Sequence, residues 1–143
     1  MKSIEHIVLI DDNRTTHYIS EHLIKCFDPN IKTTCFSNGG SALAYFNSLS
    51  EYSNPQFRSI PNLVILDLSM PDMNGWEVLE EFERLRLFHM QSIDVIILSN
   101  SDYDEDIKRS EVNPFCKGYI VKPLTLEKLS NAITILRNGF IAG

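Results

Sequence analysis

Residues 63–75 read LVILDLSMPDMNG, in which four apolar residues lead directly into Asp67 and then into a stretch with the turn-forming residues Pro71 and Gly75. A short, continuous apolar run is typical of a strand that is covered on both faces, as in a parallel sheet. Leu63–Leu68 is therefore predicted to be an inner strand with Asp67 at its carboxyl end. In the turn that follows, Pro71 fixes its own φ, and Gly75 is predicted to supply a positive φ.

Four other short runs are predicted strands, and two of them are as strongly apolar as the first: His6–Ile10, Lys32–Phe36, Ile93–Leu98 and Gly118–Val121. Between the runs, apolar residues recur at helical spacing, as Ile19, Leu23 and Phe27 do at every fourth position. Strands and helices that alternate in this way predict an α/β fold in a single domain. The predicted architecture is a doubly wound, five-stranded parallel sheet with helices on both faces, and we take 2-1-3-4-5, one of the common orders of such sheets, as its strand order.

Apolar stripes and capping residues set the limits of the predicted helices. One stripe, opposite a row of glutamates, is predicted to pack on the sheet: Val78, Leu79, Phe82 and Leu85. The last helix is predicted to begin after Thr125, as its N-cap, and to end at Gly139. The acidic run Asp102–Asp106 is interpreted as the solvated start of a helix around Asp104–Ser110, and Glu51–Pro61 as a surface loop.

Size and charge exclude several classes of protein. The chain's 143 residues suffice for one domain but fall short of the roughly 200 that an eight-stranded α/β barrel needs. Nineteen acidic residues against 13 basic ones give a formal charge of −6 without a basic cluster, which disfavours direct nucleic-acid binding. The apolar runs are too short for membrane insertion and the N-terminus lacks a secretory signal, so a cytoplasmic protein is predicted. Three cysteines without a CxxC motif are interpreted as reduced thiols.

Polar side chains stand at the carboxyl ends of four predicted strands: Asp11 and Asp12, then Asp67, Ser99 and Lys122. In the order 2-1-3-4-5 the first and third strands are neighbours, so the three carboxylates are expected to lie within a few ångströms of each other. Close carboxylates either raise one another's pKa or recruit a cation, and an all-oxygen site favours Mg²⁺ or Mn²⁺ over zinc. The sequence therefore predicts a divalent metal site at this edge of the sheet.

The serine and the lysine add groups that bind a phosphoryl group. Lys122 supplies a positive charge, Ser99 a hydroxyl donor, and Asp67 a carboxylate that can form an acyl phosphate as a nucleophile. Each group taken singly also fits a plainer role, as a helix cap, a turn residue or a solvated lysine. Their coincidence at four strand ends favours a functional site.

These motifs resemble the receiver domain of two-component response regulators, and the resemblance extends from about Glu5 to Asn138. It rests on four features that occur in the family's order and spacing: the pair Asp11–Asp12, the stretch Asp67–Gly75, Ser99 and the run Tyr119–Pro123. Only Gly139–Gly143 follow the last predicted helix. The resemblance therefore leads us to expect one receiver domain over residues 1–143, with no output domain.

The resemblance also implies specific roles for residues of the site. It implies a flavodoxin-like fold, Asp67 as the phosphoacceptor, and a cis peptide bond between Lys122 and Pro123. It further implies Mg²⁺ bound by Asp12, Asp67 and the backbone carbonyl of Ser69, with Asp11 acting through water. A histidine kinase or a histidine phosphotransfer protein is the implied phosphoryl donor, and the only catalysis implied is that of the domain's own phosphorylation and dephosphorylation.

A switch is implied as well. The Ser99 hydroxyl is expected to turn toward a phosphoryl group on Asp67, and Tyr119 to rotate from solvent into the space that is left. The surface of the Asp104–Ser110 helix, the fifth strand and the last helix would then change. We expect this surface to bind a downstream protein, and a homodimer is a further option.

Two other functions remain open. A phosphatase of the haloacid dehalogenase type also uses an aspartate after a strand, but it needs a second carboxylate where this chain has Ser69. A receiver-like interaction module that is never phosphorylated is the other alternative. The four histidines have no i, i+4 ligand spacing among themselves and are interpreted as structural or exposed: His6, His17, His22 and His89.

Overall fold

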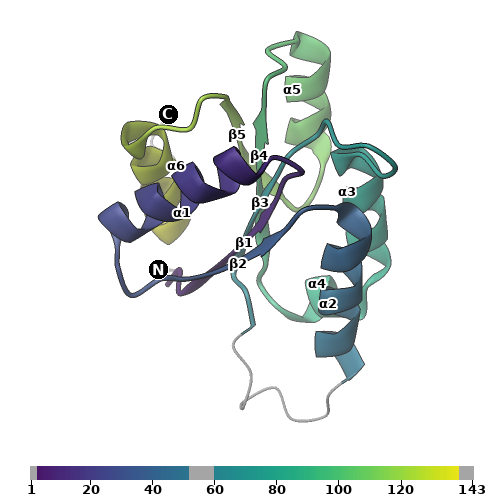
Figure 1. The fold of residues 1–143 in the computed structure, drawn as a ribbon. Coiled ribbons are helices and arrows are strands. Elements are labelled where there is room, and N and C mark those ends of the chain that lie inside the picture. The colour runs from purple at the N-terminus through teal and green to yellow at the C-terminus, as the bar shows by residue number, and fades with distance from the viewer. Residues whose placement is uncertain (1–2, 52–59, 139–143) are drawn as a thin grey trace.

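A computed structural model describes residues 3–51 and 60–138 of the chain, and Figure 1 shows its arrangement. Five parallel strands form one sheet: β1 (His6–Ile10), β2 (Lys32–Phe36), β3 (Leu63–Leu66), β4 (Asp94–Ser99) and β5 (Cys116–Val121). Their order across the sheet is β2-β1-β3-β4-β5. The predicted order 2-1-3-4-5 is confirmed.

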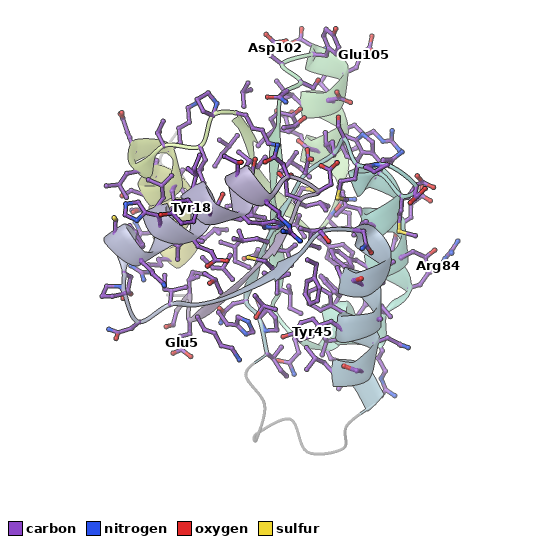
Figure 2. All side chains as sticks on the ribbon, viewed as in Figure 1. Glu5, Tyr18, Tyr45, Arg84, Asp102 and Glu105 are labelled. Atoms are coloured by element: carbon purple, nitrogen blue, oxygen red, sulfur yellow. The ribbon has the colours of Figure 1, made fainter. Side chains whose placement is uncertain are left out.

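The helices lie on both faces of this sheet (Figure 1): α1 (Arg14–Phe27), α2 (Gly39–Glu51), α3 (Gly75–Arg84), α4 (Arg86–Met90), α5 (Asp104–Val112) and α6 (Leu126–Asn138). α1 and α6 lie side by side on one face, and α2, α3 and α4 on the other. Long charged side chains at the periphery, such as those of Arg84 and Glu105, point outward (Figure 2). Both faces of the inner strands are therefore covered, as their apolar sequences predict.

Successive side chains of β1 point to opposite faces of the sheet and contribute to two separate hydrophobic cores. Ile7 and Leu9 belong to the cluster beneath α1 and α6, whereas Val8 and Ile10 belong to the cluster beneath α2, α3 and α4. Side chains on a strand point alternately to opposite faces, so one short apolar strand supplies both cores. The second cluster contains a group of aromatic rings, in which Phe82 stacks on Phe88 at 4.1 Å between ring centroids.

The limits of several elements differ from those expected. β3 ends at Leu66 rather than Leu68, which leaves Asp67 just beyond the strand, and β5 begins two residues earlier, at Cys116. The helical stripe does not continue through Leu85, which adopts an extended conformation, and the short helix α4 follows it. α4 was not predicted, because only packing of its buried Leu87 and Phe88 on the core stabilises so short a helix.

Other expectations concern the chain's turns and ends. Thr125 caps α6 as predicted, because its hydroxyl oxygen accepts a hydrogen bond from the Lys128 amide at 3.2 Å. α5 begins with an acidic first turn, as the run from Asp102 predicted. Gly139 and most of the expected loop, residues 52–59, lie outside the described residues. Within residues 3–51 and 60–138, no helix is both long enough and apolar enough to cross a membrane.

Candidate functional site

The site begins where β1 and β3 end side by side. Ile10 pairs with Leu66, and the Asp67 amide donates a hydrogen bond to the Ile10 carbonyl at 2.9 Å. Asp11 and Asp67, which directly follow these two strands, are therefore held side by side at the carboxyl end of the sheet. Together with Asp12 they place carboxylate oxygens within 4.8 Å of one another.

The three carboxylates differ in exposure. Asp11 and Asp67 are each 4% exposed, whereas Asp12 is open to solvent. Burial disfavours the charged form of a carboxylate, and neighbouring negative charges disfavour it further. Two buried acids and one exposed acid therefore form a site that favours binding of a cation.

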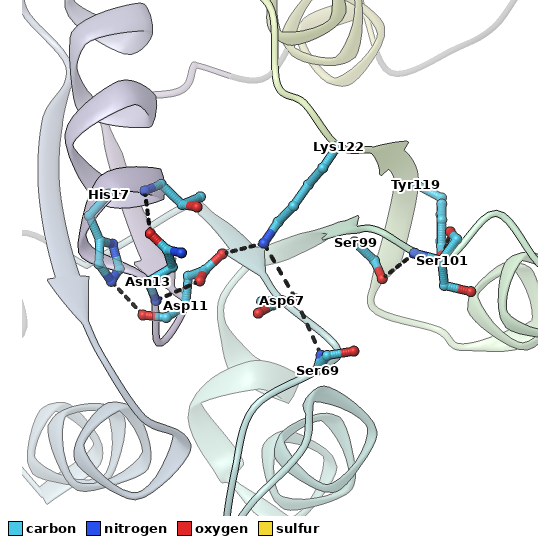
Figure 3. A network of polar contacts seen from close by, with 10 residues as sticks. Asp11, Asn13, His17, Asp67, Ser69, Ser99, Ser101, Tyr119 and Lys122 are labelled. Atoms are coloured by element: carbon cyan, nitrogen blue, oxygen red, sulfur yellow. Dashed lines mark hydrogen bonds and ion pairs between the residues drawn. The ribbon is translucent and has the colours of Figure 1, made fainter.

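Lys122 provides positive charge from the end of β5. Its ammonium donates a hydrogen bond to Asp11 Oδ2 at 3.0 Å and lies 3.8 Å from Asp67 Oδ1 (Figure 3). The peptide bond between Lys122 and Pro123 is cis, as the family resemblance implied. The lysine lies nearer to Asp11 than to Asp67, and it contacts both.

The balance of these charges sets the pKa of Asp67. That pKa is raised from 3.8 to about 6, first by burial and then by the negative charge of Asp11. Lys122 and a hydrogen bond from the Ser69 amide to Asp67 Oδ1, at 3.2 Å, act in the opposite direction. The positive charge of Lys122 does not fully offset the effects of burial and of the neighbouring carboxylates, so the pKa of Asp67 stays raised.

This donor set fits a hard divalent cation. Carboxylate oxygens are the ligands that Mg²⁺ prefers, and it is commonly held by one or two of them together with water. Asp11, Asp12 and Asp67 are the side chains that could hold it here. The backbone of Ser69, whose amide already contacts Asp67, lies next to this set.

The predicted switch residues meet at Ser101, in the loop after β4. The buried Ser99 hydroxyl oxygen accepts a hydrogen bond from the Ser101 amide at 3.1 Å. The Tyr119 hydroxyl donates to the Ser101 carbonyl at 2.7 Å, and its half-buried ring packs against the core. One loop residue therefore links the two side chains that the resemblance assigned to a switch (Figure 3).

Gly75 is required for a different reason from the one its sequence suggested. Its φ is not positive, and the residue of this loop with a positive φ, 67°, is Asp72. A Cβ at Gly75 would lie 2.6 Å from the Asp67 carbonyl oxygen and 2.9 Å from Leu68 Cα. The start of α3 therefore packs directly on the backbone of Asp67 and Leu68.

Gly75→Ala is expected to lower the free energy of unfolding by about 1–3 kcal/mol, because backbone must move to admit a methyl group. Urea unfolding would measure the loss. Gly40→Ala is the matched control, since a Cβ there meets its nearest neighbour, Asn38 Oδ1, at an ordinary 3.5 Å. Equal stability of the Gly75 variant and the wild-type protein would contradict this account of the loop.

Two residues at the start of α1, its N-cap Asn13 and His17 in its first turn, were missed as parts of the site. The Asn13 side chain caps α1 through the Thr16 amide at 3.1 Å, and the Nε2 of His17 donates to the Asp11 carbonyl at 2.5 Å. Asn13 directly after two aspartates is a recognisable capping signal. Nothing in the sequence indicates that His17 folds back onto Asp11, because the contact depends on where the loop turns.

Known proteins resemble this chain in sequence and in fold. Residues 7–134 match the family described as "Response regulator receiver domain". The probable methanogenesis regulatory protein FilR2 of Methanothrix harundinacea (strain 6Ac) is 29% identical over 135 residues, covering 94% of this chain and 83% of that protein. A two-component response regulator from Cytophaga hutchinsonii gives a TM-score of 0.81 at 24% identity, over 96% of this chain and 99% of that one.

A third similarity is to a solved structure described as the phosphorylated cyanobacterial phytochrome response regulator RcpA. It gives a TM-score of 0.68 at 26% identity and covers 93% of this chain and 91% of that one. The predicted flavodoxin-like fold is confirmed by these likenesses.

Proposed function

Because this chain belongs to the response regulator receiver family, a family of two-component signalling modules rather than conventional enzymes, we propose that it accepts a phosphoryl group on Asp67 with the aid of Mg²⁺ or Mn²⁺. The observation that carries this proposal is the convergence of three carboxylates within 4.8 Å, with Lys122 in contact with two of them. The related regulator RcpA, described as phosphorylated, adds support.

Each residue of the site has a role in the proposed transfer. An oxygen of Asp67 attacks the phosphorus atom, and a P–O bond forms as the bond from phosphorus to the donor's leaving group breaks. The leaving group, an imidazole nitrogen of a phosphohistidine, departs with the bonding electron pair. The Lys122 ammonium and the Ser99 hydroxyl stabilise the phosphoryl oxygens.

The cation would be held by Asp12, Asp67 and the Ser69 carbonyl, with Asp11 acting through water. When bound, it neutralises charge on the transferring group. Asp11 also holds the Lys122 ammonium at 3.0 Å. The donor of the phosphoryl group is proposed to be a histidine kinase or a histidine phosphotransfer protein in the cytoplasm.

A downstream protein is proposed to bind the face formed by α5, β5 and α6. A groove between β5 and α6 runs along this face, and its lining mixes apolar and basic side chains, including Lys117, Tyr119, Lys128 and Ile135. Tyr119 reaches from this groove to Ser101, and Ser101 contacts Ser99. Rearrangement of Ser99 at the site is therefore expected to alter the groove, whether a target protein or a second copy of the chain binds there.

Intact mass spectrometry after incubation with acetyl phosphate and Mg²⁺ tests the proposal. We expect a gain of one phosphoryl group, which is lost with EDTA and in the Asp67→Asn variant. The matched control is Asp72→Asn, which removes a nearby exposed carboxylate and keeps the adduct. An unmodified wild-type protein that also fails to bind Mg²⁺ would replace the proposal with the non-phosphorylated interaction module.

A further inference from the structure

His17 hydrogen-bonds to two backbone carbonyls of the segment that carries Asp12, that of Asp11 before it and that of Asn13 after it. Its ring Nε2 donates a hydrogen bond to the Asp11 carbonyl at 2.5 Å, and its backbone amide donates to the Asn13 carbonyl at 3.2 Å. Because a carbonyl oxygen only accepts hydrogen bonds, the ring hydrogen must lie on Nε2. One residue of α1 therefore fixes the backbone before and after Asp12.

The neighbouring aspartates are held in other ways. The Asp11 carboxylate accepts from the Asn13 amide at 2.9 Å and from Lys122 at 3.0 Å. Asp67 accepts from the Ser69 amide at 3.2 Å. Asp12, by contrast, is exposed, and its carboxylate can be placed for a cation chiefly through the backbone that carries it.

The His17 ring is itself confined. Its Nδ1 is buried and has no hydrogen-bond partner in the part of the chain that the structure describes. The ring borders a cavity of about 10 Å³ that Ser20, Leu98 and Asp67 also line. A ring that keeps a buried, unpaired nitrogen at this point is held there by its Nε2 bond and by packing, since an unpaired buried polar atom is otherwise unfavourable.

We propose that His17 is a positioning residue for the metal site, which holds the Asp12 backbone so that the Asp12 carboxylate is directed to the cation. This inference rests on the proposed function, because it assumes that Asp12 binds the metal. Only the ring hydrogen bond depends on histidine, since any residue other than proline at position 17 would keep the backbone bond to Asn13. Residues that orient metal ligands typically contribute 10–100-fold to metal affinity.

Isothermal titration calorimetry with Mg²⁺ measures the effect directly and requires no phosphorylation. His17→Ala is expected to raise the Kd for Mg²⁺ at least about tenfold. His17→Gln, whose amide nitrogen can replace Nε2 as donor, is expected to recover most of the affinity, whereas the shorter His17→Asn is not. Thermal unfolding without metal verifies that each variant is folded.

His89 offers a matched control. Its Nε2 also donates to a backbone carbonyl six residues earlier, that of Glu83, but it lies before β4, at the opposite edge of the sheet from the acidic site. His89→Ala is expected to leave the Mg²⁺ affinity within twofold of the wild-type value. Both alanine variants lose the same kind of hydrogen bond, so a loss of Mg²⁺ affinity in His17→Ala alone cannot be due to the loss of such a bond in general.

The outcomes distinguish this inference from the proposed function. If the wild-type protein binds Mg²⁺ and His17→Ala binds it equally well, His17 only supports the fold and the inference is overturned, while the proposed function stands. Equal losses of affinity in the alanine and glutamine variants would also overturn it, since the donor would then be irrelevant. If the wild-type protein binds no Mg²⁺, both the inference and the proposed metal site fail.

Discussion

Asp67→Asn is expected to make the protein more stable at pH 7 in the absence of metal, by about 2–3 kcal/mol, even as it removes the proposed phosphoacceptor. The reason is the raised pKa of Asp67, which is about 6 in the folded protein against an ordinary value of 3.8. Each unit of pKa difference corresponds to about 1.4 kcal/mol between the two protonation states. Asparagine occupies the same volume without a charge that burial and Asp11 oppose.

The sign of the pH dependence follows from proton binding. Below about pH 3.8 the Asp67 carboxyl is protonated in both states and does not affect stability relative to asparagine. Between about pH 3.8 and 6 the unfolded chain has lost this proton while the folded protein keeps it, so this group lowers the wild-type free energy of unfolding as pH rises. The advantage of the variant should therefore grow across this window and stay constant above it.

Urea unfolding of both proteins between pH 3.5 and 8, in EDTA, measures the difference. Asp72→Asn is the control for a change of one charge, because Asp72 is exposed and asparagine tolerates its positive φ. Saturating Mg²⁺ should reduce the advantage of the variant, since a ligand that binds the folded wild-type protein stabilises it. A variant no more stable than the wild-type protein at pH 7 would show that the Asp67 carboxylate is not disfavoured by its surroundings.

Lys122→Met is expected to slow phosphorylation by acetyl phosphate about 100- to 1,000-fold at saturating Mg²⁺. Removing one group that stabilises transition-state charge typically costs this much. The lysine also lowers the pKa of Asp67, so without it that pKa should rise further above 6. The pH at which the rate reaches its plateau should therefore shift upward in the variant.

Lys117→Met on the same strand is the matched control. Lys117 is exposed and its ammonium donates to the Pro114 carbonyl, away from the acidic site, so its loss should change the rate less than twofold. Time-resolved intact mass spectrometry measures all three rates. If Lys122→Met and Lys117→Met were phosphorylated equally fast, the ammonium at the site would have no part in the transfer.

The apolar runs predicted a doubly wound parallel sheet, and with the strand order 2-1-3-4-5 the residues directly after them predicted the positions of Asp11, Asp67 and Lys122. This succeeded because parallel strands in the order β2-β1-β3-β4-β5 must bring the carboxyl ends of β1 and β3 together. Strand periodicity is a local property of the chain. A residue that directly follows a strand must lie at the carboxyl end of that strand, so its position in the sheet follows from the strand order.

Other features depended on contacts between distant segments. α4 forms because Leu87 and Phe88 meet an existing core, and Gly75 is required because α3 packs on the Asp67 backbone, not because of its φ. The arrangement of Tyr119, half-buried and hydrogen-bonded to the Ser101 carbonyl, depends on the packing of β5 beside the β4–α5 loop.

The sequence by itself determined which chemical groups are present and which edge of the sheet carries them. Only the tertiary structure decided how these groups interact. It forms the hydrogen bond from Lys122 to Asp11, raises the pKa of Asp67, and brings the His17 ring to the Asp11 carbonyl. The physical reason is that periodicity and capping are encoded within a few residues. Burial, hydrogen-bond partners and the electrostatic balance of a site are set by side chains that meet only after the chain has folded.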